Sequence, residues 1–187
     1  MAELSPALPD DVVENAERRW TYVVGGVVVF VFAVIVFAGV HWAAQPPSNV
    51  ETIDASTLHL SGEFVEANLG TEVGPDGSAI VRVIAQQYSF VPECIVVPTE
   101  TKVVFRVVSP DVVHGFLIAD TNVNSMVVPG FVAEVRTRFD KAREHVMPCH
   151  EYCSVGHEGM WARVRVLDRS EFARAYGGQK RASCARK

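Results

Sequence analysis

One uninterrupted apolar run near the N-terminus constrains the fold of this chain more than any other feature. From Thr21 to Val40 the sequence reads TYVVGGVVVFVFAVIVFAGV and contains no charged residue. At 1.5 Å per residue, about 20 residues form roughly 30 Å of helix, which is enough to cross the hydrocarbon core of a bilayer. We therefore expect a transmembrane helix over residues 20–42, with Trp20 and Trp42 at the two headgroup levels.

A cleaved signal peptide is the alternative interpretation of this run. It fits poorly because the run is too long, the preceding segment is acidic, and no small-residue cleavage site follows. Arg18 and Arg19 flank the start of the run, whereas the next Lys or Arg is Arg82. The positive-inside rule then predicts a single-pass plasma-membrane protein, with residues 1–19 as a cytoplasmic tail and the chain after residue 42 on the outer side.

The remainder of the chain has a β pattern that begins at Ala79. Short runs rich in β-branched residues are separated by Pro, Gly and Asp turn signals: 79–85, 94–97, 102–108, 112–118, 132–139 and 161–167. Such strands predict a β-sandwich or barrel with antiparallel pairing. Residues 43–78 are expected to be a linker that leads into a soluble domain over 79–168, and the basic segment 169–187 is expected to be a frayed tail.

Composition limits the number of domains and one class of partner. With 187 residues, the chain has room for one ordinary domain with accessories, but not for two full domains. Its formal net charge of -5 and its 21% of charged residues do not indicate a broad basic surface, so no nucleic-acid partner is expected.

A cluster of soft metal ligands lies between the last two predicted strands. Cys149, Cys153, His157 and Met160 follow one another with the spacing C-x3-C-x3-H-x2-M. Two thiolates, an imidazole and a thioether suit copper better than calcium or magnesium. His114, just after a Ser-Pro-Asp turn, offers a further imidazole. Because mononuclear blue-copper sites use one Cys, two Cys indicate two metal ions that share bridging thiolates.

Two other interpretations of the cysteines are weaker. A Cys pair outside the cytoplasm could form a disulfide, but this would not explain His157 and Met160 at fixed steps. A structural zinc site would favour C-x2-C or C-x4-C spacing with further nitrogen or sulfur ligands, and it would not recruit Met. Cys94 and Cys184 have no partner pattern, so we interpret Cys94 as a core residue and Cys184 as a tail residue.

These motifs resemble those of a known family. The segment Cys-x-Glu-x-Cys-x-x-x-His-x-x-Met, with Asp-Val-Val-His-Gly-Phe upstream, is similar to the CuA domain of subunit II of haem-copper cytochrome c oxidases. The resemblance covers the membrane helix and residues 79–167. The single helix and the segments DVVHGF and TNVNSMVVPG resemble most the B-type (ba-type) oxidases. The resemblance implies a mainly β fold, namely a cupredoxin-like Greek-key β-sandwich after one N-terminal transmembrane helix.

The resemblance also implies a dinuclear copper (CuA) site made of six residues: His114, Cys149, Glu151, Cys153, His157 and Met160. Both thiolates would bridge the two copper ions. His114 and Met160 would complete the coordination of one ion, and His157 with the backbone carbonyl of Glu151 that of the other. The Glu151 side chain matches the position that binds magnesium or manganese at the subunit I interface in A-type oxidases, whereas B-type relatives often have Gln there.

In A-type relatives a Trp-Tyr-Trp segment near the copper site receives the electrons of the donor. The matching stretch here is QQYSF, residues 86–90, which contains no Trp. Tyr88, Phe90 and Trp161 are therefore candidates for the patch where electrons enter. Packing in the core is the alternative interpretation for each of the three.

The function implied by the resemblance is that of the subunit through which electrons enter a terminal haem-copper oxidase. It would accept electrons from cytochrome c or a small copper protein and pass them to a haem of subunit I, where oxygen is reduced to water and protons are moved. The chain would act in an enzyme only as a subunit. Two alternatives remain open: a CuA subunit of a haem-copper nitric oxide reductase, and a stand-alone, membrane-tethered copper electron carrier, against which Glu151 argues.

Overall fold

The computed structural model describes residues 9–41 and 51–184, and the chain forms two units, 1–49 and 50–187, which we describe separately. The first unit contains α1 (Asp10–His41), whose 32 residues correspond to about 48 Å of helix. The expected apolar span lies within α1, which is long and apolar enough to cross a membrane. The predicted end of the span, residue 42, lies outside the described residues.

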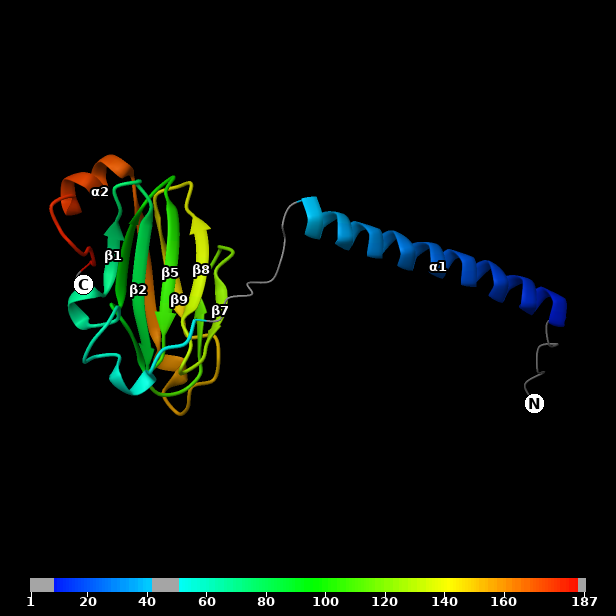
Figure 1. Ribbon diagram of the computed structural model, residues 1–187, viewed down its shortest axis with the longest axis horizontal. Helices are drawn as coiled ribbons and strands as arrows, with labels where there is room; N and C mark the ends of the chain where they lie inside the picture. The colour runs from blue at the N-terminus through cyan, green and yellow to red at the C-terminus, as the bar shows by residue number, and fades with distance from the viewer. Residues whose placement is uncertain (1–8, 42–50, 185–187) are drawn as a thin grey trace, which may run out of the picture. The chain divides into compact units, whose positions relative to one another are not determined.

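The second unit is a β-sandwich (Figure 1). Its strands, in chain order, are β1 (Gly70–Val73), β2 (Ala79–Gln86), β3 (Ser89–Val91), β4 (Cys94–Pro98), β5 (Lys102–Val108), β6 (His114–Leu117), β7 (Asn124–Val127), β8 (Ala133–Arg138), β9 (Arg143–Pro148) and β10 (Trp161–Leu167). One sheet has the order β1-β2-β5-β8, with β3 paired to β2. A second sheet has the order β4-β10-β9, and β6 pairs with β7. The short helices are η1 (Ala55–Thr57), η2 (Glu66–Asn68), η3 (His157–Gly159) and α2 (Arg169–Tyr176).

The predicted sandwich is confirmed, but the expected antiparallel pairing is only part of the arrangement. All six predicted runs contain a strand, whereas β1, β3, β7 and β9 were not predicted. Two pairs are parallel: β2 with β5, where Ile80 is opposite Val104, and β4 with β10, where Ile95 is opposite Val164. Parallel neighbours require a crossover connection, and a local sequence pattern does not reveal which strands it brings together.

The core lies between the two sheets and extends into the ligand region. Alternate side chains of each strand point inward, such as Phe105 of β5 and Val164 of β10, which are both 0% exposed. Burial of such side chains contributes about 1.5–3 kcal/mol each. The same apolar cluster includes Cys149, Cys153 and Met160, so the soft ligands lie inside the packed sandwich.

Residues 51–69, expected to belong to a linker, instead pack on the larger sheet. Arg106 of β5 forms ion pairs with Glu51 and Glu63, each at 2.7 Å, and Arg82 of β2 binds Glu63 at 2.9 Å. A second apolar cluster also joins this segment to the sheet: Leu58, Phe64, Ile84 and Val108. The compact soluble unit therefore begins well before residue 79.

Residues 169–184 form α2 and a packed segment, so the expectation of a frayed tail over 169–187 was wrong for this part, and residues 185–187 lie outside the described residues. α2 buries Phe172 against β4, and the chain then returns to the edge of β1. There Thr71 and Ala182 exchange two backbone hydrogen bonds, at 2.9 and 2.8 Å. We call residues 169–184 the C-terminal clasp, because they contact both sheets.

A disulfide between Cys94 and Cys184 closes the clasp. Cys94 is buried as predicted, whereas the interpretation of Cys184 as a tail residue was wrong, because Cys184 is also buried and is bonded to Cys94. The two residues are 90 positions apart, so no local spacing could indicate the pair. In Figure 1, α2 lies at one end of the sandwich and the loop between β9 and β10 lies at the other end.

Candidate metal centre

Two structural elements bring the predicted ligands together. His114 is the first residue of β6, and the loop 149–160 between β9 and β10, which we call the ligand loop, carries the others. The backbone N–H of Cys149 donates to the carbonyl of Met160 at 3.0 Å, so the two ends of the loop are joined. The backbone N–H of His150 donates to the carbonyl of Gly115 at 3.2 Å, which fixes the loop beside β6.

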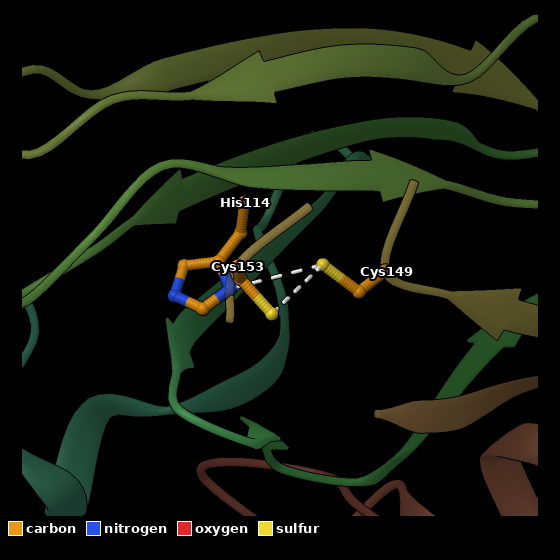
Figure 2. A group of neighbouring side chains, drawn as sticks. All are labelled: His114, Cys149 and Cys153. Carbon is orange, nitrogen blue, oxygen red and sulfur yellow. Dashed lines mark hydrogen bonds between the residues drawn. The ribbon is translucent and has the colours of Figure 1, made fainter. Parts of the chain in front are cut away.

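The two thiols lie side by side next to an imidazole (Figure 2). The Sγ of Cys149 is 3.8 Å from the Sγ of Cys153 and 3.7 Å from the Nδ1 of His114. His114 is 0% exposed, and both cysteines are buried. These three residues each offer one ligand atom, and the three atoms lie within 4.8 Å of one another.

The remaining predicted ligands surround the same pair of thiols. The Sγ of Cys153 is 3.6 Å from the Nδ1 of His157 and 3.8 Å from the Sδ of Met160. The carbonyl oxygen of Glu151 is 3.3 Å from the Sγ of Cys149, while the Glu151 side chain is exposed. The structure thus brings together all six residues of the predicted set, with Glu151 contributing its backbone.

The electrostatics of the thiols favour a bound cation. Burial, followed by the hydrogen bond and charge of Cys149, raises the pKa of the Cys153 thiol to about 11. A cation beside the sulfur would favour the thiolate form of Cys153, since the thiolate is the form that binds a metal. Paired sulfurs with a thioether and two imidazoles form a donor set that fits copper, whereas a structural zinc site does not use Met.

Asp111 was not predicted, yet it orients one of the ligands. Its Oδ1 lies 2.9 Å from the Nε2 of His114. Burial alone would raise the pKa of Asp111, but hydrogen bonds from the Gln87 backbone, His114, the Val112 backbone and Ser109 lower it below its ordinary value. An ionised Asp111 can only accept, so the Nε2 of His114 carries the proton and the Nδ1 lone pair faces Cys149.

Comparison with known proteins places this chain in a family. Residues 81–167 match the family described as cytochrome c oxidase subunit II, periplasmic domain. A cytochrome c oxidase subunit 2 of Thermus thermophilus is 31% identical over 155 residues, which are 81% of this chain and 92% of the relative. The chain belongs to the cytochrome c oxidase subunit II family. Another subunit 2 from Thermus thermophilus is 34% identical over 124 residues, 66% of this chain and 91% of the relative.

A solved structure supports the same assignment. A chain in the cryo-EM structure of a haem-copper terminal oxidase dimer matches with a TM-score of 0.62 and 26% identity, over 81% of this chain and 99% of that chain. The predicted cupredoxin-like fold is thereby confirmed for this subunit II. The chain is therefore a subunit of an oxidoreductase complex, a haem-copper oxidase, in which subunit I is its partner. The family supports a role in electron entry and implies a copper centre.

The three aromatic candidates for the patch where electrons enter separate into two groups. Phe90 is 0% exposed and packs edge-on against Phe116, so it belongs to the core of subunit II and not to a surface patch. Tyr88 and Trp161 are 40% and 55% exposed, so core packing is the wrong interpretation for them. Sequence reasoning also missed two exposed side chains of the ligand loop: Tyr152 and Val155.

Proposed function

We propose that this chain is the subunit through which electrons enter a terminal haem-copper oxidase, with a dinuclear CuA centre in the ligand loop. The observation that supports this most directly is the pair of buried thiols, 3.8 Å apart, with an imidazole within 3.7 Å of each. Two adjacent sulfurs allow both metal ions to share both thiolates, which a single-Cys copper site cannot provide.

In this proposal, each ligand has one role. Cys149 and Cys153 would hold both copper ions through their thiolates. His114 and Met160 would complete the coordination of one ion, and His157 with the backbone carbonyl of Glu151 would complete that of the other. The Nδ1 of His114 lies 3.7 Å from the Sγ of Cys149, and the Nδ1 of His157 lies 3.6 Å from the Sγ of Cys153, so both imidazoles reach the pair of thiols.

A bound dinuclear copper centre would accept and release one electron at a time, with the charge shared between two ions. The protein residues keep the geometry constant during this change. Met160 is 0% exposed inside the core, and His114 is fixed by Asp111, so neither ligand has space to move. Ligands held by packed elements are better positioned than ligands on free loops.

The exposed aromatic and apolar side chains beside the ligand loop support a docking surface for the electron donor. Trp161 directly follows Met160, and its indole N–H donates to the carbonyl of Glu158 at 2.6 Å, which orients the ring. Tyr152 packs edge-on against His157, with ring centroids 5.9 Å apart. We propose that cytochrome c or a small copper protein binds here.

The partner and the membrane topology complete the proposal. Electrons would pass to a haem of subunit I, where oxygen is reduced to water and protons are translocated. The pair Arg18 and Arg19 supports a cytoplasmic N-terminus. The disulfide from Cys94 to Cys184 supports an outer, oxidising location for the soluble unit, since such bonds are rare in the cytosol. The exposed Glu151 carboxylate could bind magnesium or manganese at the subunit I interface.

The test uses the full-length chain in detergent, loaded with copper and compared with Cys149→Ser. We expect two copper ions per chain, a purple colour and an electron paramagnetic resonance signal that is delocalised over both ions. The variant should lose this signal. One copper per wild-type chain, or a colourless zinc protein, would contradict the dinuclear proposal. Co-purification with a haem-bearing subunit and oxygen uptake test the oxidase assignment.

A further inference from the structure

Gln87 contacts both halves of the candidate metal centre, although it is not a ligand. It lies in the turn between β2 and β3. Its side-chain amide donates a hydrogen bond to the carbonyl oxygen of Cys153 at 2.7 Å. Its backbone N–H donates to the Oδ2 of Asp111, also at 2.7 Å, and the Oδ1 of Asp111 binds His114. One residue thus connects the ligand loop to the imidazole of β6.

The connection matters because the two halves come from separate parts of the chain. Backbone contacts join the ligand loop to β6 at the first two positions of the loop, where Cys149 pairs with Phe116 and the N–H of His150 donates to the carbonyl of Gly115. Those contacts fix the beginning of the ligand loop, and the bond from the N–H of Cys149 to the carbonyl of Met160 joins the end of the loop to its beginning. The carbonyl of Cys153 lies in the middle of the loop, where Gln87 supplies the hydrogen bond from outside the loop.

We propose that Gln87 is a positioning residue of the copper centre, which holds the bridging residue Cys153 in register with His114 through its amide and Asp111. The inference rests on the proposed function, since it assigns a role toward the copper ions. Without the amide, the middle of the ligand loop loses its tie to the β2–β3 turn. The thiolate on the same residue is then less well fixed, and groups of this kind contribute roughly 10–100-fold to metal affinity or activity.

The surroundings of Gln87 allow hydrogen bonding and packing to be separated. The residue as a whole is exposed, so its packing contributes little. Gln87→Met keeps the length of the side chain and removes only the donor, whereas Gln87→Ala also removes volume. The adjacent Gln86, at the end of β2, provides a matched control because its side chain makes no hydrogen bond within the described residues.

The experiment compares the full-length chain in detergent with Gln87→Met, Gln87→Ala and Gln86→Ala. Copper-loaded samples are challenged with a chelator, and their paramagnetic resonance spectra and reduction potentials are recorded. Hydrogen–deuterium exchange of residues 149–160 is measured on the copper-free chain. We expect both Gln87 variants to lose copper roughly tenfold faster, to shift the potential and to exchange faster in the loop, while Gln86→Ala resembles the wild type.

The outcomes separate this inference from the proposed function. A wild-type chain that binds no copper pair would contradict the proposed function, but loop exchange would still decide whether Gln87 holds the loop. If Gln87→Met retains copper, potential and loop protection like the wild type, the positioning role is overturned. The positioning role is also overturned if Gln87→Ala is impaired while Gln87→Met is not, because the defect would then come from the lost volume of the side chain. Exchange in the β-strands identifies a variant that has not folded.

Discussion

The carbonyl oxygen of Gly115 accepts a hydrogen bond from the backbone N–H of His150 at 3.2 Å, and no side chain fits beside this contact. A Cβ added at Gly115 would lie 2.5 Å from the backbone nitrogen of Glu151 and 2.5 Å from the carbonyl carbon of His150. Both of these atoms belong to backbone, so neither can rotate away. The residue after His114 must therefore be glycine if the ligand loop is to lie against β6.

Gly115→Ala should push the ligand loop away from His114. We expect a loss of about 1–3 kcal/mol in the free energy of unfolding, as for other overpacked positions, together with loss of the delocalised copper signal. Gly159→Ala is the matched control, since an added Cβ there meets nothing within 4 Å. Copper counting and paramagnetic resonance of both variants check the prediction. A Gly115→Ala chain with the wild-type spectrum would show that the loop can move without harm.

Substitution of the ligands should follow an order set by their roles. Cys153→Ser removes a sulfur that both ions share in the proposed centre, so the mixed-valence signal should disappear. Met160→Leu keeps the volume and apolarity of a fully buried side chain, so copper should stay bound with a shifted potential and a stability loss below about 1.5 kcal/mol. Metal content and redox titration measure both effects. If Met160→Leu lost the copper signal and Cys153→Ser kept it, the bridging residues would be assigned incorrectly.

Trp161→Ala should slow the reaction with the electron donor without altering the copper spectrum. The ring is 55% exposed beside the ligand loop, and aromatic side chains at the centre of an interface often contribute about 2 kcal/mol to binding. The second-order rate of reduction by the donor should then fall more than tenfold. Val73→Ala removes an exposed apolar side chain on β1 and serves as the control. Equal rates for both variants would place the docking surface elsewhere.

Removal of the disulfide should lower stability and leave the copper site intact. Replacement of Cys94 and Cys184 by Ser opens a ring of 90 residues, which by loop entropy costs about 4–5 kcal/mol. The bond lies outside the ligand set, so the copper spectrum should not change under conditions where the chain stays folded. Denaturant titration of the full-length chain, followed by spectroscopy, checks both parts. A changed spectrum would show that the C-terminal clasp also positions the metal site.

Acid should weaken the contact between residues 51–69 and the larger sheet. Burial alone would raise the pKa of Glu63, but hydrogen bonds and charge from Arg106 and Arg82 lower it below 4.5. Because the folded-state pKa is the lower one, the stabilisation is present above about pH 4.5 and is lost as pH falls through the folded value.

Glu63→Gln should therefore lose about 1–2 kcal/mol at pH 7 and show a flatter decline in stability below pH 4.5 than the wild type. The loss stays this small because the Glu63 side chain is 29% exposed and solvent screens its charge. Unfolding free energies from neutral pH down to about pH 3 measure this slope. Glu66→Gln is the control, since Glu66 is exposed and forms no ion pair among the residues described. Equal acid slopes for the Glu63 variant and the wild type would assign the acid sensitivity to other groups.

The sequence predicted those parts of the fold whose signal is local. Runs such as KVVFRVV contain enough β-branched residues to identify a strand, and the spacing of Cys149, Cys153, His157 and Met160 indicates a metal site directly. The strands that were missed are short or polar: β7 reads NSMV, and β9 begins with Arg and Glu. Their pairing comes from long-range contacts and not from their own composition.

The parts of the site that were missed are those that act through other residues. Asp111 and Gln87 contact ligands from different segments, so no spacing within the motif indicates them. The disulfide joins residues 90 positions apart for the same reason. Trp161 faces solvent because it lies on the outward face of β10, in phase with Arg163 and opposite to the buried Ala162, as the alternation of this strand indicates.

The parallel pairing of β4 with β10 also fixes the order in which the protein can be assembled. β10 follows the ligand loop, and it must cross to a strand formed more than 60 residues earlier before the loop is held against His114. In a chain made from its N-terminus, the site is therefore completed only after β10 has been made. Because the predicted ligands come from β6 and from the ligand loop and meet only in the folded sandwich, copper binding should stabilise the fold.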